Sequence, residues 1–257
     1  MNFLELLKKP NLIAAHRGDR SQKPENTLSA LTSSIGKCDF IEIDVQLTKD
    51  LVPVIIHDDT LGRTSNVSNI ERFKDRTPWR VSDFTFEELQ SLDFGSWFDH
   101  EYEPILTLEK ALSFAKEEHI FLNVEIKDMS GTFPDEIVVQ ITIDMIKKMQ
   151  TEHLVLLSSF YHTYLPMCKE HSPDIPTAAL QMYKHPNRLI DYLHSLKVDA
   201  YHPEDRITKQ KTVVSLREAG FFLNVFTVND TIRKTKLFNW GVNGIFTDFL
   251  ERWEERG

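Results

Sequence analysis

Acidic side chains with the spacing of a binding site occur within residues 40–59, FIEIDVQLTKDLVPVIIHDD. In residues 41–45 apolar and acidic residues alternate, which is the pattern of a β-strand. Side chains two residues apart on a strand share a face, so Glu42 and Asp44 are expected to project together. Paired carboxylates on one strand face are suited to binding a cation, although a solvated polar face would show the same pattern.

A histidine follows the next predicted strand, residues 52–56, at His57. Parallel neighbours need a crossover of a dozen or more residues, and the connection here is much shorter. The two strands are therefore expected to form a hairpin. A turn centred on Lys49 and Asp50 would pair His57 with Glu42.

Polar residues also follow two other predicted strands. A strand at residues 11–15 leads into His16 and Arg17, and FLNVEI carries Glu125 and runs into Lys127. In a parallel barrel, functional residues lie at the C-terminal ends of the strands, so these groups are expected to meet.

The residue types in this set are suited to acid–base chemistry at a metal-bound phosphate group. Three carboxylates without a cysteine among them favour Mg²⁺ or Ca²⁺ over zinc. Arg17 and Lys127 can hold the oxygens of a phosphate. Two histidines can divide the proton transfers, one accepting from the nucleophile and one donating to the leaving alkoxide.

The composition is typical of a soluble globular protein, with 41% hydrophobic and 27% charged residues in 257. A net charge of −9 argues against a nucleic-acid or anionic-membrane binder. Cys38 and Cys168 make no disulfide framework, and no stretch reads as a signal peptide or a membrane span. These features predict a cytoplasmic protein without membrane insertion.

Strands and helices alternate along most of the chain, which indicates βαβ units. The predicted parallel strands begin near residues 12, 40, 120, 154, 177, 198, 222 and 244. Eight strands predict a (β/α)₈ TIM barrel as a single domain, residues 1–257, with an open doubly wound sheet as the alternative. Residues 1–8 are expected to close one end of the barrel. The aromatic-rich residues 60–104 are expected to form a small insertion after the hairpin, packed on itself.

Five segments together carry a family resemblance: HRGDRSQKPENT, EIDVQLTKDLVPVIIHDDTLGRT, VEIK, SSF and NVFTVN. In this combination the chain resembles the glycerophosphodiester phosphodiesterase family over nearly its whole length. The resemblance implies a barrel that hydrolyses glycerophosphodiesters to glycerol 3-phosphate and an alcohol.

The resemblance also implies roles for single residues. His16 and His57 would be the acid–base pair, Glu42, Asp44 and Glu125 the metal ligands, and Arg17 and Lys127 the phosphate contacts. The family often has tryptophan where this chain has Phe226, so Phe226 would line the glycerol site with a different shape. Asp19 and Arg20 stand after HRG where smaller residues are common.

Several other polar residues have a structural interpretation beside a functional one. Glu25 could orient Arg17, contact the groups that surround the metal, or cap a helix, and Ser158 and Ser159 lie in no nucleophile-elbow pattern. His202 ends a predicted strand and could face substrate. Asp58 and Asp59 are expected to cap the turn after His57 rather than to bind metal.

Three functions are consistent with the sequence. The first is metal-dependent hydrolysis of small glycerophosphodiesters, through either a cyclic phosphate or direct attack by water. The second is a lysophospholipase D-like activity with an apolar groove beside the insertion. The third is a non-catalytic phosphate-ligand-binding barrel. The head-group alcohol and the oligomeric state are not encoded in any of these motifs.

Overall fold

Eight parallel strands close into a barrel in the computed structural model, which describes residues 1–253. Around the ring the order is β1-β10-β9-β8-β7-β6-β5-β2, and the pairing of β1 with β2 closes it. This confirms the predicted TIM barrel and excludes the open sheet. The barrel strands are β1 (Leu12–His16), β2 (Phe40–Leu47), β5 (Phe121–Ile126), β6 (Val155–Ser159), β7 (Thr177–Gln181), β8 (Ala200–Pro203), β9 (Phe222–Val225) and β10 (Gly244–Thr247).

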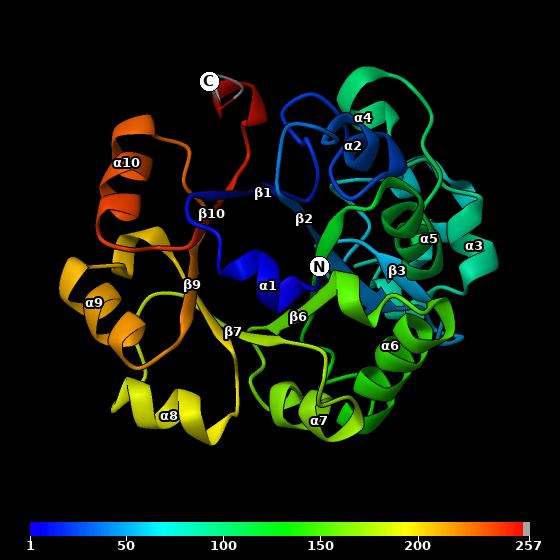
Figure 1. Ribbon diagram of the computed structural model, residues 1–257. Helices are drawn as coiled ribbons and strands as arrows, with labels where there is room; N and C mark the ends of the chain where they lie inside the picture. The colour runs from blue at the N-terminus through cyan, green and yellow to red at the C-terminus, as the bar shows by residue number, and fades with distance from the viewer. Residues whose placement is uncertain (254–257) are drawn as a thin grey trace.

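Helices cover the outside of this ring (Figure 1). In α6, buried Val138, Val139, Thr142, Ile143 and Ile146 recur at helical spacing and face the strands, as an amphipathic helix requires. None of the helices in the described part of the chain is long and apolar enough to cross a membrane. The helices of the ring are α2 (Leu28–Ser33), α5 (Leu108–Glu118), α6 (Asp135–Met149), α7 (Tyr164–His171), α8 (Leu189–Ser195), α9 (Gln210–Glu218) and α10 (Thr231–Asn239).

The N-terminal helix α1 (Phe3–Leu7) lies across one end of the barrel (Figure 1). The Phe3 ring contacts Phe40 and Phe121 at centroid distances of 5.4 and 5.5 Å, in edge-to-face geometry. Phe40 and Phe121 are the first residues of β2 and β5, so α1 closes the end of the barrel where the strands begin. The opposite end is left for the site.

The insertion after β2 begins with a hairpin. Strand β3 (Pro53–Ile55) pairs antiparallel with β2, and β4 (Leu106–Thr107) pairs with β3. Between them lie α3 (Phe86–Gln90), α4 (Ser96–Asp99) and three 3₁₀ helices. The 3₁₀ helices among residues 1–253 are Val67–Asn69, Glu71–Arg76, Val81–Asp83, Glu152–Leu154, Asp205–Ile207 and Leu250–Trp253.

The insertion has a small hydrophobic core of its own. Phe73, Phe84 and Phe94 are buried in it, and the Arg76 guanidinium stacks over the Phe84 ring at 3.8 Å. The packing role predicted for these aromatic residues is therefore confirmed. Trp97 and Tyr102 remain 40% and 60% exposed.

The hairpin register differs from the sequence prediction by one residue. Val45 faces Ile55, and the Ile56 amide donates to the Asp44 carbonyl, so the pairing leads His57 toward Ile43 rather than Glu42. The cause is a loop with an odd number of residues, 49–51, in which Leu51 adopts a left-handed φ of 63°. Compared with the expected two-residue turn, a three-residue loop shifts the pairing of the two strands by one residue.

His202 does not face the site. Its side chain is fully buried in β8, where Nε2 accepts a hydrogen bond from Asn224 Nδ2 at 3.0 Å and the ring lies 5.1 Å from that of Phe246. Burial lowers the pKa of His202 from 6.5 to about 3. The imidazole is thus neutral in the folded protein, and its position does not support the possibility that it contacts substrate.

This burial predicts acid sensitivity. The folded-state pKa of His202 is depressed, so its contribution to stability is complete above pH 6.5 and is lost as the pH falls toward 3. Between pH 8 and pH 5 the loss should be about 2 kcal/mol. In urea unfolding, the free energy of unfolding of the wild type should therefore fall between pH 8 and pH 5 by about 2 kcal/mol more than that of His202→Gln. Equal losses in both proteins would contradict the prediction.

Candidate active site

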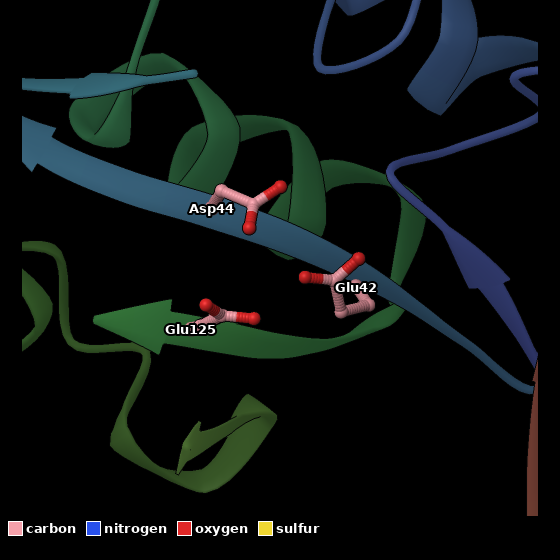
Figure 2. Close-up of side chains that lie close together, drawn as sticks. All are labelled: Glu42, Asp44 and Glu125. Carbon is pink, nitrogen blue, oxygen red and sulfur yellow. The ribbon is translucent and has the colours of Figure 1, made fainter. Parts of the chain in front are cut away.

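Three buried carboxylates lie together where β2 and β5 run side by side. The register of the two strands pairs Asp44 with Glu125, and Glu42 lies two residues earlier on the same face of β2. Figure 2 shows the three side chains pointing toward one another. One oxygen of each lies within 4.8 Å of the others, so the triad could hold a metal ion. The convergence expected from the sequence is present.

The electrostatics of this triad also favour a cation. Burial, reinforced by repulsion from the other two carboxylates, raises the pKa of Glu42 well above its usual value. Burial likewise raises the pKa of Glu125 to about 7. Burial would raise the pKa of Asp44 too, but the charges of Lys127 and Arg17 outweigh it and lower that pKa. An all-oxygen donor set with unfavourable like charges fits a hard divalent cation.

Arg17 is held at the end of β1 by a tight turn. Arg17 and Gly18 both have left-handed φ values, 59° and 82°. A Cβ on Gly18 would lie 2.8 Å from Ala30, so only glycine fits this turn. The Arg17 amide donates to Glu42 Oε2 at 2.9 Å, and its Nε lies 3.4 Å from Asp44 Oδ2. The guanidinium therefore lies directly beside the acidic triad.

Lys127 supplies a second positive charge. Its Nζ lies 2.8 Å from Glu125 Oε1 and 3.4 Å from Asp44 Oδ1. Burial opposes its charge, but the two carboxylates outweigh burial and raise the pKa of Lys127. Arg17 and Lys127 are thus permanent cations at the triad, as the sequence predicted.

His16 and His57 share one hydrogen-bonding arrangement. His16 Nδ1 lies 2.7 Å from Asp248 Oδ1, and His57 Nδ1 lies 2.7 Å from Asp58 Oδ1. A carboxylate at Nδ1 favours the tautomer with a proton there and leaves Nε2 as the nitrogen for chemistry. Burial is the main cause that lowers the pKa of both histidines.

A cavity of about 570 Å³ joins these groups. Its polar lining includes His16, Arg17, Glu42, His57 and Glu125. Its apolar wall comes from the ends of β6, β7, β9 and β10 and is formed by Phe160, Leu180, Met182, Phe226 and Phe246. No residue of the described insertion, 60–104, lines this cavity. The groove expected beside the insertion lies instead on the other side of the barrel mouth.

Phe226 lies on the cavity wall. Its ring meets that of Phe160 edge to face at a centroid distance of 5.6 Å. Glu204 and Arg206 lie on the same side of the cavity and form an ion pair. Phe226 and Phe160 therefore form an apolar surface of the cavity, and the ion pair of Glu204 and Arg206 lies beside it.

Sequence reasoning missed four residues that support the site. Asn26 Nδ2 donates to Asp44 Oδ2 at 2.9 Å, while Arg20 and Asp248 contact each other near His16, and Arg63 contacts Asp58 near His57. Asp248 directly follows β10. The expectation that functional residues lie at the C-terminal ends of strands, which identified His16, could therefore have identified Asp248 as well. Arg63 lies in the insertion, and no local pattern marks it.

At the same edge the expectation for Asp58 needs correction, and one of the alternatives for Glu25 is confirmed. Asp58 does not simply cap a turn, because its carboxylate contacts His57 and Arg63, and these bonds lower its pKa to about 2. Glu25 does orient Arg17, accepting from Nη1 at 2.9 Å, whereas the N-cap of α2 is Thr27. Both acids act on neighbouring side chains.

Comparison with known proteins places this site in a family. The model of the "Glycerophosphoryl diester phosphodiesterase family" matches residues 16–252. The chain belongs to this family. The glycerophosphodiester phosphodiesterase of Bacillus altitudinis is 33% identical over 93% of this chain and 95% of its own length. That of Caldanaerobacter subterraneus is 32% identical over 92% and 93%. As a member of this family, the chain is a phosphoric diester hydrolase.

Solved structures agree with this assignment. An Oleispira antarctica phosphodiesterase in complex with the product sn-glycerol-3-phosphate superposes with a TM-score of 0.84 and 28% identity, over 96% of each chain. A family enzyme from Thermotoga maritima has a TM-score of 0.72 at 21% identity, which shows the shared fold. The barrel and the family assignment are therefore consistent.

Proposed function

We propose that this enzyme hydrolyses glycerophosphodiesters to glycerol 3-phosphate and an alcohol, with His16 and His57 as its acid–base pair. One observation carries the proposal: both histidines, each with Nδ1 held by a carboxylate, border the cavity that Glu42 and Glu125 of the acidic triad also line. The product bound to the Oleispira relative supports the same reaction.

In this proposal each residue has one role. Glu42, Asp44 and Glu125 hold one divalent cation, Mg²⁺ or Ca²⁺. When bound there, the cation supplies Lewis-acid stabilisation of charge on the phosphate oxygens. Arg17 and Lys127 bind the same phosphate, and Phe226 lines the glycerol site.

Nε2 of one neutral histidine accepts the proton of the nucleophile. The other histidine, in its imidazolium form with protons on both nitrogens, donates the Nε2 proton to the leaving alkoxide as the P–O bond breaks. The nucleophile is either water or the neighbouring glycerol hydroxyl. In the second route a cyclic phosphate forms and is then opened by water. A 2-deoxyglycerol analogue that reacts at the normal rate would support direct attack by water.

The cysteines, the range of the family match and the net charge bear on localisation, domain organisation and partners. Within residues 1–253 neither Cys38 nor Cys168 forms a disulfide, which is the pattern expected of a reducing, cytoplasmic compartment. The family match over residues 16–252 supports one barrel domain that carries the insertion at 60–104. The net charge of −9 supports a small-molecule phosphodiester as partner rather than nucleic acid.

A substrate panel tests the proposed activity. We expect the purified enzyme to release glycerol 3-phosphate from glycerophosphocholine, glycerophosphoethanolamine or glycerophosphoglycerol in the presence of Mg²⁺ or Ca²⁺. Mass spectrometry of the products distinguishes glycerol 3-phosphate from phosphocholine, the product of cleavage on the other side of phosphorus. Release of phosphocholine, or no turnover with any of the three diesters, would overturn the proposal.

The apolar wall supports a second candidate, a lysophospholipase D-like activity. Phe160, Leu180 and Met182 offer an apolar surface beside the polar half of the cavity, where an acyl chain would lose its contact with water. Comparing kcat/KM for glycerophosphocholine and its acylated form decides between the two substrates. A higher value for the acylated form would establish the second activity.

A further inference from the structure

A continuous series of charge-assisted hydrogen bonds begins at His16. Its Nδ1 meets Asp248 Oδ1 at 2.7 Å, and Arg20 Nη1 donates to the same oxygen at 3.3 Å. The other terminal nitrogen of Arg20, Nη2, donates to Glu25 Oε2 at 2.7 Å. Three contacts thus lead from His16 to Glu25.

A second series begins at His57 and ends at the same glutamate. His57 Nδ1 meets Asp58 Oδ1 at 2.7 Å, and Arg63 binds Asp58 through Nε and Nη2, at 2.6 and 2.9 Å. Arg63 Nη1 and Nη2 also donate to Glu25 Oε2 and Oε1, at 3.1 and 2.7 Å. A single guanidinium therefore connects two carboxylates with bidentate geometry, which lysine cannot reproduce.

Glu25 lies where the two series meet. Its side chain is 3% exposed, and its two oxygens accept hydrogen bonds from Arg17, Arg20 and Arg63. Burial alone would raise the pKa of Glu25, but the hydrogen bond from Arg63 and the three positive charges outweigh it and lower the pKa. A buried carboxylate that stays ionised holds all three guanidinium groups in fixed positions.

We propose that Glu25 is a positioning residue shared by both histidines. It fixes Arg20 and Arg63, which in turn hold Asp248 and Asp58 against the two Nδ1 atoms. One buried charge thereby sets the tautomer and the orientation of both imidazoles. This inference rests on the proposed function only for its catalytic consequence, because the hydrogen bonds themselves do not depend on the substrate.

The two histidines depend on Glu25 to different degrees. Asp248 has a second support, since its Oδ2 accepts from Asn229 Nδ2 at 2.8 Å and its amide donates to Asn229 Oδ1. Within residues 1–253, the Asp58 carboxylate receives hydrogen bonds from Arg63 and His57 alone. Removal of the Glu25 charge should therefore disturb His57 more than His16.

Imidazole tautomers observed by ¹H–¹⁵N NMR on ¹⁵N-histidine-labelled enzyme test the proposal. Spectra of His16→Gln and His57→Gln assign the two signals. In the wild type we expect a proton on Nδ1 of both rings. Glu25→Gln should give mixed tautomers, more strongly at His57. It should also lower kcat by roughly 10–100-fold with little change in KM, the usual effect of losing an outer hydrogen-bond partner.

Two arginine variants separate the branches. Arg63→Lys keeps the charge but cannot connect both carboxylates, so it should shift the His57 tautomer and leave His16 unchanged. Arg20→Lys should shift His16 alone. The effects of Glu25→Gln and Arg63→Lys on kcat should not multiply in the double variant, because both act through one contact.

Glu88→Gln is the matched control, because Glu88 accepts from Arg76 at 2.6 Å within the insertion, away from the histidines. It should leave both tautomers and kcat unchanged. The proposal is overturned if Glu25→Gln unfolds at a lower temperature than the wild type but keeps both tautomers and kcat. If Glu25→Gln does not fold, Arg63→Lys decides, since an unchanged His57 tautomer there refutes the coupling. Absence of turnover in the wild type would refute the proposed function, while the tautomer result would still stand.

Discussion

Replacement of either His16 or His57 by alanine is expected to lower kcat for glycerophosphocholine by about 10²–10⁴-fold, with KM changed far less. This is the usual contribution of one positioned general acid or base. Both imidazoles border the same cavity, and each has Nδ1 held by a carboxylate, so neither should replace the other. Initial-rate measurements at saturating cation check the prediction.

His153→Ala is a suitable control, because His153 is exposed in a 3₁₀ helix that directly precedes β6, at the end of the barrel opposite the site. It should retain wild-type turnover. The double variant His16→Ala/His57→Ala should lose less than the product of the two single losses, because a proton transfer needs both partners. Full activity in both single variants would show that His16 and His57 are not the acid–base pair.

The sequence predicted the barrel because its signals are local. Eight apolar strands separated by amphipathic helices leave few other architectures, and all eight appear in the ring. Helix α10 (Thr231–Asn239) also begins at a local signal, since the Asp230 side chain caps it by accepting from the Arg233 amide. Strand β8 lies two residues later than predicted. Strand β8 ends at Pro203, which pairs with Gln181 of the parallel strand β7, so the end of β8 depends on its neighbour and not on a local pattern.

The acidic triad was predictable for a related reason. Strand alternation places Glu42 and Asp44 on one face, and the parallel register of β2 and β5 then brings Glu125 beside them. Neither step needs information from distant parts of the chain beyond the order of the strands. The predicted hairpin register was wrong because the register depends on the left-handed backbone conformation of Leu51. A leucine in the sequence gives no indication of that conformation.

The supporting residues were less accessible. Arg63 reaches Glu25 over 38 positions, and Asp248 reaches His16 over 232. Such contacts depend on how the insertion packs on the barrel and on how the last strand closes it. Patterns within a window of ten or twenty residues carry no information on either.

Removal of divalent cations is expected to have a large effect on activity. Treatment with EDTA should lower turnover by about 10³-fold or more, because several kcal/mol of charge stabilisation are lost. Addition of Mg²⁺ or Ca²⁺ in excess should restore it, and the better of the two identifies the preferred ion. Asp44→Asn should weaken the restoration by removing one anionic ligand from the buried triad.

The pKa values of the triad predict how cation binding depends on pH. Glu125 has its pKa raised from 4.5 to about 7 and that of Glu42 is raised as well, so without metal the folded protein retains protons that the unfolded chain releases. Stability without metal therefore falls as the pH rises from 4.5 to 7. The lowered pKa of Asp44 keeps that carboxylate ionised throughout this range.

A bound cation favours the deprotonated carboxylates, so its stabilisation of the fold should increase over the same range. We expect the rise in Tm on addition of excess Mg²⁺ or Ca²⁺ to be larger at pH 8 than at pH 5.5, and to be strongly reduced in Asp44→Asn. A Tm shift that is equal at both pH values, or larger at pH 5.5, would show that the ion does not bind by displacing protons from Glu42 and Glu125. The triad assignment would then be wrong even if activity required a metal.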